Sequence, residues 1–235
     1  MSRLIVLRPE PGASSTITKA AALGIAATAC PLFRIEPIDW TPPLAANFDA
    51  LLMTSAQAVR TGGATLARYQ GLPTYAVGKA TAEAMAGAGF SGVTVGDTDG
   101  AAIAARIVAD GHRHILHLTG ANVAAFDPGP LLIRREALYA AVEAADHAAL
   151  AAVLEPGGVL MVHSPRAGGR LNALVIEAVR GALHIVAISP AALAACGEGW
   201  ASARAADAPN DAAMLALAAL LCEGHSHAKH DDGGS

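Results

Sequence analysis

Short apolar runs that lack polar alternation are the feature of this chain that most limits its fold. A half-exposed strand alternates apolar and polar residues, whereas a strand buried on both faces of a parallel sheet is apolar throughout. The stretches between the runs are rich in alanine and have helical spacing. This alternation of strand and helix predicts an α/β fold with parallel sheets and right-handed crossovers. The runs lie at residues 4–7, 50–53, 74–77, 115–118, 159–162 and 185–188, and the helices at 14–23, 56–68, 80–87, 101–109, 171–179 and 211–221.

Two segments do not fit this alternation, because each mixes apolar and polar residues without a helical stripe. The first spans Pro31 to Trp40, and the second spans residues 133–145. Both indicate half-exposed extended chain, as expected if the chain leaves one domain, builds a second and returns through a paired linker. The predicted parts are a discontinuous first domain at 1–34 and 143–222, a second domain at 40–133, linker strands at 35–39 and 134–142, and a flexible tail at 224–235.

An internal repeat supports the prediction of two similar domains. In both copies a strand is followed by a polar turn, a helix, a second strand, a second polar turn and further helices. The repeated stretches are 51–58 with 160–167, 74–82 with 185–193, and 97–100 with 208–211.

Charge and composition exclude several classes of protein. The chain is 53% hydrophobic with a formal net charge of −4, which excludes general disorder and disfavours a nucleic-acid partner. It has neither an 18-residue apolar run nor the apolar core of a signal peptide, so we expect no membrane span and a cytoplasmic location. The cysteines Cys30, Cys196 and Cys222 are far apart and indicate buried apolar side chains rather than a disulfide framework.

Hydroxyl groups and glycines follow the predicted strands. The carboxyl ends of parallel strands meet at one edge of a sheet, where ligands bind and where helix N-termini present unpaired N–H groups to anions. Each such residue alone indicates a simple helix cap. Their recurrence in both repeats favours a cleft for anions. The residues are Thr54-Ser55, Gly78-Lys79, Thr119-Gly120, Ser164-Pro165 and Ser189-Pro190.

Basic side chains lie near the same turns. Each alone is a solvated surface residue, but together they suit a ligand with several carboxylates or phosphates. They are Arg8, Arg60, Lys79, Arg166 and Arg170.

Other signals of chemistry are weak. Tyr139, in the second linker segment, could donate a proton in an interdomain cleft, or it could simply pack against the paired linker. In a strand His112 and His114 share one face and His117 takes the other, so we predict no metal site there. The histidine-rich tail indicates a solvated chain end, and Gly168-Gly169 indicates a turn.

With these motifs in this order, the chain resembles the uroporphyrinogen-III synthase family. The resemblance implies two α/β domains joined by a two-stranded linker. It also implies that the linear tetrapyrrole hydroxymethylbilane is cyclised with loss of water and inversion of the last pyrrole ring, through a spiro intermediate and without cofactor or metal. The matching stretches are 5–9, 53–59, 75–82, 118–120, Tyr139, 163–167, 187–192 and Ala208-Pro209.

The resemblance also implies roles for particular residues. Tyr139 is the expected acid, and the ligand contacts that the resemblance implies are Thr54, Ser55, Gly78, Thr81, Ser164 and Ser189. The basic residues Arg8, Lys79 and Arg166 are added as expected contacts because of their place near the same turns. The chain departs from the family where Gln57 replaces a frequent Asn, and where Ala191 and Ala192 replace a frequent Thr.

Alternative functions remain open from the sequence. One is a non-catalytic two-domain binder of a polyanionic small molecule, which would need the cleft but not Tyr139. Another is a different cofactor-free lyase or isomerase, and a third is an interaction module with an exposed apolar surface. For the synthase we expect a monomer that makes a transient contact with the preceding deaminase.

Overall fold

A computed structural model describes residues 3–96, 100–123 and 125–228, and it gives the side chains up to residue 222. The chain forms two compact units. Unit 1 contains the segments up to Arg34 and from Val142 onward, and unit 2 contains Ile35–Ala141. The chain passes between them inside β3 (Phe33–Pro37) and inside β8 (Leu132–Glu143).

The sheet of unit 1 has, within the described residues, the strand order β2-β1-β9-β10-β11, and all its neighbours are parallel. The order reverses between β1 and β9, and at such a reversal the loops beyond the carboxyl ends diverge and leave room for a ligand. The strands are β1 (Leu4–Val6), β2 (Ala27–Ala29), β9 (Val159–Val162), β10 (His184–Ala187) and β11 (Ser202–Ala205).

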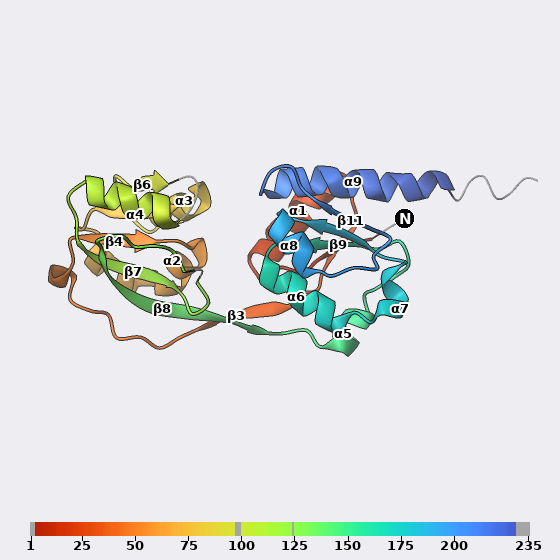
Figure 1. Cartoon of the computed structure of the whole chain (residues 1–235), viewed down its shortest axis with the longest axis horizontal. Coiled ribbons are helices and arrows are strands. Elements are labelled where there is room, and N and C mark those ends of the chain that lie inside the picture. Colours follow the sequence, from red (N-terminus) through yellow and green to blue (C-terminus); the bar gives the residue numbers. More distant parts are fainter. Residues whose placement is uncertain (1–2, 97–99, 124, 229–235) are drawn as a thin grey trace, which may run out of the picture. The chain divides into compact units, whose positions relative to one another are not determined.

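Helices cover both faces of this sheet, and Figure 1 shows α9 on one side of it and α6 on the other. Met214 and Leu215 of α9 pack with Leu4, Val6 and Met161 of the strands in one buried cluster. Each such buried side chain stabilises the fold by about 1.5–3 kcal/mol. The helices are α1 (Gly12–Ala22), α5 (His147–Ala151), α6 (Pro165–Leu174), α7 (Glu177–Arg180), α8 (Pro190–Ala195) and α9 (Asp211–Ala228).

The sheet of unit 2 has the order β3-β8-β7-β4-β5-β6 in the described residues. Its strands from β8 to β6 are parallel, and the order reverses between β4 and β7. Leu51 and Met53 pack in a buried cluster with α2, while Leu52 packs on the opposite face with α4. The elements are β4 (Ala50–Met53), β5 (Thr74–Val77), β6 (Thr94–Gly96), β7 (His114–Gly120), α2 (Ala56–Gly62), α3 (Lys79–Gly87), α4 (Gly100–Ala109) and the 3₁₀ helices η1 (Ala45–Asn47) and η2 (Gly63–Tyr69).

The predicted helix at 171–179 is wrong. Helix α6 begins at Pro165 and ends at Leu174, and the short α7 follows it. The error came from taking Gly168-Gly169 as a turn. A Cβ on Gly168 would lie 2.6 Å from the Ala192 carbonyl oxygen, so this glycine lets α6 contact α8 closely.

Other sequence boundaries also change. Of the predicted helix at 56–68, only Ala56–Gly62 is α-helical, and η2 takes the rest. Helix α9 continues through residues 224–228, which the sequence assigns to a flexible tail; residues 229–235 lie outside the described residues, as do Asp97 to Asp99 of the repeat. No helix in the described part of the chain is both long and apolar enough to cross a membrane.

Candidate active site

The carboxyl ends of β4, β7 and β8 in unit 2 bring several polar side chains together. Thr54 and Ser55 follow the buried apolar strand β4 directly. Adjacent residues of extended chain point to opposite faces of the sheet, so these two hydroxyls serve two separate groups of partners. Both side chains are half-buried, and they lie at the reversal of strand order where open α/β sheets bind ligands.

Ser55 forms a pair of hydroxyl groups with Tyr139. The Ser55 Oγ accepts a hydrogen bond from the Gln57 N–H at 3.2 Å, which caps α2, and lies 2.9 Å from the Tyr139 phenol oxygen. Tyr139 is half-buried and packs against the apolar cluster beneath α2. The sequence predicted both residues for the site, and the structure brings them into direct contact.

Gly120 explains how Tyr139 reaches Ser55 across the intervening strand. The pairing of β7 with β8 is irregular at Thr119/Gly120, which sets Gly120 opposite Tyr139. A Cβ on Gly120 would lie 2.6 Å from the Tyr139 Cζ atom. The phenol ring therefore passes over a position that only glycine leaves open.

We expect Gly120→Ala to displace the Tyr139 ring and to lower the free energy of unfolding by about 1–3 kcal/mol, as overpacking does. Urea unfolding measures the loss, and the Tyr139 ring signals in an NMR spectrum should shift. Gly71→Ala is the matched control, because a Cβ at Gly71 meets no neighbour. Equal stability of the two variants would contradict this role of Gly120.

On the other face of the sheet, Thr54 meets two residues of β7. Its Oγ1 lies 2.9 Å from His117 Nε2 and 3.3 Å from Thr119 Oγ1. His117 is fully buried. Burial lowers the pKa of His117 to about 4, and the positive charge of Arg135 acts in the same direction. The ring is therefore neutral at physiological pH.

The turn after β5 offers the site backbone groups, and its charged side chain is not buried. Gly78 has a φ of +81° and precedes the first residue of α3, a conformation that favours glycine. The Lys79 side chain is 90% exposed and lies 3.9 Å from Glu83. Thr81 is buried in α3. Of these predicted contacts, Lys79 is the one whose side chain is freely accessible.

In unit 1 the predicted ligand contact Arg8 is already paired. Its Nη1 lies 2.9 Å from Asp211 Oδ1, and Lys19 Nζ lies 2.8 Å from Asp211 Oδ2. His163 Nε2 lies 3.4 Å from Asp211 Oδ1, the distance of a long and weak hydrogen bond. The His163 ring, Lys19 and Arg8 hold the pKa of Asp211 well below its usual range, while burial lowers the pKa of His163.

The serines that follow β9 and β10 are helix caps, as the simpler interpretation predicts. Ser164 Oγ accepts from the Ala167 N–H at 3.1 Å and Ser189 Oγ accepts from the Ala192 N–H at 3.2 Å. Each hydroxyl keeps its own hydrogen for a further acceptor. The guanidinium carbon of Arg166 lies 4.3 Å from the centre of the Phe33 ring.

Sequence reasoning missed the buried contacts of His117, His163 and Asp211. The available signal was a histidine inside an apolar run, as in Ile115-Leu116-His117-Leu118, because a polar side chain in a buried strand needs a partner. Its partners depend on strand order, which the chain order does not give. The described residues contain no group of His, Cys, Asp or Glu that could hold a metal ion.

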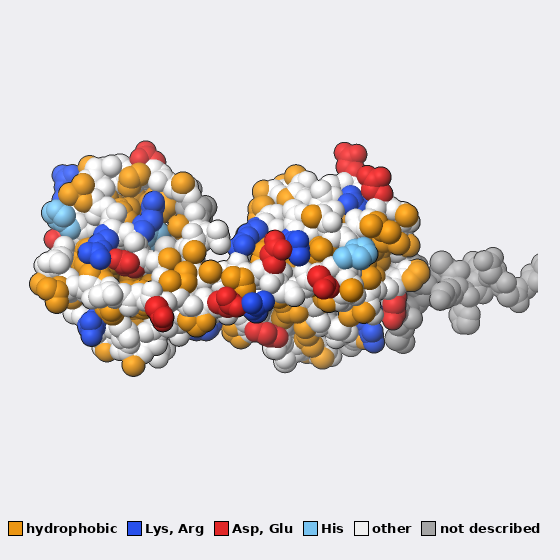
Figure 2. Space-filling model, turned by 90° about the horizontal axis from the view of Figure 1, so that it is seen from below, with side chains coloured by type: hydrophobic (Ala, Val, Ile, Leu, Met, Phe, Trp, Pro, Cys, Tyr) orange, Lys and Arg blue, Asp and Glu red, His pale blue; other side chains and the backbone are white. Residues whose placement is uncertain are grey.

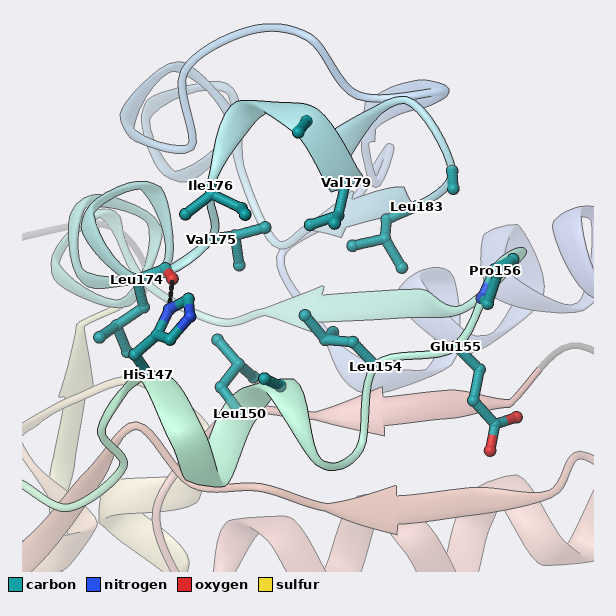
Figure 3. A pocket seen from close by; sticks show the side chains of 13 residues that line it. His147, Leu150, Leu154, Glu155, Pro156, Leu174, Val175, Ile176, Val179 and Leu183 are labelled. Atoms are coloured by element: carbon teal, nitrogen blue, oxygen red, sulfur yellow. Dashed lines mark hydrogen bonds between the residues drawn. The ribbon is translucent and has the colours of Figure 1, made fainter.

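An apolar cavity of about 330 Å³ in unit 1 lies apart from these residues. Figure 3 shows its leucine and valine lining, with Leu150, Leu154, Val179 and Leu183 pointing into it. Its histidine, His147, already donates from Nδ1 to the Leu174 carbonyl oxygen at 2.7 Å. This lining is unsuited to an anion. Figure 2 shows basic and acidic side chains interspersed on the face in view.

Comparisons with known proteins give one consistent family. A family model described as uroporphyrinogen-III synthase HemD matches residues 14–216, whereas no curated protein matches. The crystal structure of uroporphyrinogen-III synthetase from Helicobacter pylori is 15% identical, covers 94% of this chain and 100% of its own, and has a TM-score of 0.63. A mutant uroporphyrinogen III synthase from the extremely thermophilic bacterium Thermus thermophilus is 14% identical, covers 95% and 100%, and has a TM-score of 0.56.

At such low sequence identity the two solved structures show only that the fold is shared. The assignment of the chain to a family rests on the family model. Its match includes every strand from β2 to β11 and all the polar strand ends described above except Arg8. The chain therefore belongs to the uroporphyrinogen-III synthase family.

Proposed function

We propose that this chain converts hydroxymethylbilane into uroporphyrinogen III by means of the Tyr139–Ser55 pair, in the tetrapyrrole (haem) pathway of its family. The observation that carries this assignment of roles is the 2.9 Å contact between the two hydroxyls. It lies at the reversal of strand order in unit 2, where a ligand is expected.

The first chemical step needs a proton donor. The substrate becomes a reactive azafulvene when its pyrrole nitrogen gives up the N–H proton to water and the hydroxyl of the hydroxymethyl group leaves as water, for which the hydroxyl oxygen must gain a proton. Tyr139 donates that proton, and the Ser55 O–H then donates to the phenol oxygen, which stabilises the developing negative charge. The Gln57 N–H, which donates to Ser55 Oγ, fixes the serine in this orientation.

The second step is governed by geometry. The azafulvene carbon bonds to the substituted carbon of the last ring, and rearrangement of the resulting spiro intermediate inverts that ring. Because the linear substrate also closes unaided, without inversion, the protein gains its selectivity by holding the last ring in one orientation. A packed Tyr139 ring beside the reacting end suits that role.

The carboxylates of the substrate need several donors. We assign them to the hydroxyls of Thr54, Ser164 and Ser189 and to the charges of Lys79 and Arg166. Because Asp211 already pairs with Arg8, Arg8 acts on the substrate through its positive electrostatic field and does not bind a carboxylate directly. At α8, where the family often has Thr, Ala192 is buried and Ser189 supplies the hydroxyl.

We further propose that the chain acts as a monomer and receives its labile substrate through a transient contact with the preceding deaminase. Neither the Tyr139–Ser55 pair nor its supporting glycine needs a second copy, since all three residues lie in unit 2.

The test is to incubate the protein with porphobilinogen and the deaminase, oxidise the products and separate the porphyrin isomers. We expect mostly the type III isomer, above a control without this protein. The proposal would be contradicted if only the type I isomer formed although circular dichroism showed that the protein has an intact α/β fold.

A further inference from the structure

His117 is a histidine where a strand of this kind normally has an aliphatic residue. It lies in β7 between Leu116 and Leu118, it is fully buried, and its ring centre is 5.9 Å from that of Phe126. A buried polar group that is not satisfied costs stability, so its presence calls for a role.

We infer that His117 is a positioning residue that makes the hydroxyls of Thr54 and Thr119 hydrogen-bond donors toward a substrate carboxylate. This inference deepens the proposed function, because the carboxylate belongs to the tetrapyrrole. It adds to the Tyr139–Ser55 pair a second group of residues on the opposite face of the same strand ends.

The two nitrogens of the His117 ring have different surroundings. Nε2 lies 2.9 Å from Thr54 Oγ1. Nδ1 is buried, and no hydrogen-bond partner for it is found among the described residues. A neutral imidazole carries one N–H donor and one acceptor nitrogen, so the question is which nitrogen holds the proton.

The buried nitrogen settles the tautomer. A proton on Nδ1 would leave a buried N–H without an acceptor, and such groups are rarer in proteins than acceptors without a donor. The ring proton therefore lies on Nε2, which donates to Thr54 Oγ1. Low solvent access and the nearby Arg135 keep the ring from taking a second proton, since they hold the pKa of His117 at about 4.

The direction of the hydrogen bond between His117 and Thr54 decides whether Thr54 can donate a hydrogen bond to a ligand. Its oxygen already accepts from His117, so its O–H must donate, either to Thr119 Oγ1 at 3.3 Å or to an incoming acceptor. In the first case the O–H that remains to donate is that of Thr119, which is buried. Either way the group presents an O–H, which favours a carboxylate and disfavours a ligand that is itself a donor.

The position of the group supports an encounter with the substrate. Thr54 follows β4 and Thr119 lies near the end of β7, the two strands between which the order reverses. Thr54 is half-buried, whereas Thr119 and His117 are buried, so Thr54 is the member of this group that lies nearest to solvent. Ser55, the partner of Tyr139, is the next residue in the chain.

The first test is the tautomer itself, observed by long-range ¹H–¹⁵N NMR on the labelled full chain without ligand. We expect His117 as the neutral Nε2–H form, unchanged between pH 8 and about pH 5. The exposed His114 on the same strand is the internal control. A proton on Nδ1 would overturn the inference whatever the activity of the protein.

The second test is a double-mutant cycle on the binding of uroporphyrin III, a stable octacarboxylate, followed by fluorescence. We expect His117→Leu to weaken binding about tenfold in the wild-type background, as the loss of one oriented charge-assisted bond does. In the Thr54→Val background the same change should have almost no effect, because His117 acts through Thr54. His117→Gln, which keeps an N–H near the Nε2 position, should bind within about threefold of wild type.

Other results would separate this inference from the proposed function. Equal losses of affinity in both backgrounds would mean that His117 only fills space, and they would overturn the inference. A wild-type chain that binds no uroporphyrin would overturn it as well. If His117→Leu does not fold, the binding of uroporphyrin III by His117→Gln and the tautomer observed by NMR decide whether the inference holds. A chain that passes both tests and forms only type I isomer would refute the proposed function and leave the role of His117 intact.

Discussion

Replacing Tyr139 by phenylalanine is expected to slow formation of the type III isomer about 100-fold, because loss of a general acid typically costs at least that factor. The variant keeps the ring that packs in the buried cluster beneath α2 and loses only the phenol hydroxyl that meets Ser55. The substrate then closes mostly by the unaided route to the type I isomer. The measurement is the initial rate of each isomer in the coupled assay, with KM determined alongside kcat.

Tyr75→Phe is the matched control for this experiment. The Tyr75 hydroxyl donates to Asp110 at 2.9 Å, and Tyr75 lies inside β5 rather than at a strand end. We expect this variant to keep the wild-type isomer ratio and to lose about 1 kcal/mol of unfolding free energy. A Tyr139→Phe variant as fast as wild type would show that the phenol is not the acid.

The second large effect is expected on stability, from Asp211→Asn. This carboxylate has a side chain only 10% exposed and balances Arg8 and Lys19. The variant leaves two cations near a neutral amide, and we expect it to lower the free energy of unfolding at pH 7 by about 2 kcal/mol. Urea unfolding measures the loss.

The pH dependence of this loss has a definite sign. The pKa of Asp211 is lowered in the folded protein, so its contribution is fully present above the unfolded value of about 3.9 and disappears as the pH falls through the folded value. The advantage of wild type over Asp211→Asn should therefore shrink progressively as the pH falls below about 4. The exposed Asp207 provides the control variant Asp207→Asn, and a wild-type advantage that is as large at pH 2 as at pH 7 would contradict the account.

Burial explains which parts of the fold the sequence could predict. The apolar runs correspond to β1, β4, β5, β7, β9 and β10, and the α/β class with parallel strands is confirmed. The strands β2, β6 and β11 were not predicted, because none of them is fully buried. An edge strand of three or four residues makes few contacts and leaves little trace in the residue pattern.

In the candidate site, too, some features could be predicted from the sequence and others could not. Chain order alone indicates that Thr54, Ser55, Ser164 and Ser189 follow strands, because each directly succeeds an apolar run or lies one residue beyond it. The contact of Ser55 with Tyr139 depends on β8 lying beside β7, on an irregular register and on a glycine between them. These are long-range features that no local pattern encodes.

The place of β1 in its sheet has a consequence for how the protein is made. Its neighbours are β2, the next strand in the chain, and β9, whose first residue is Val159. A ribosome adding 5–20 residues per second takes roughly 8 to 30 s to supply the intervening chain. Throughout that interval one edge of the strand Leu4–Val6 stays unpaired on the nascent polypeptide, and the whole of the continuous unit 2 is made before its partner β9. Until β9 has been made, the emerging chain therefore carries an unpaired apolar strand edge, which favours aggregation.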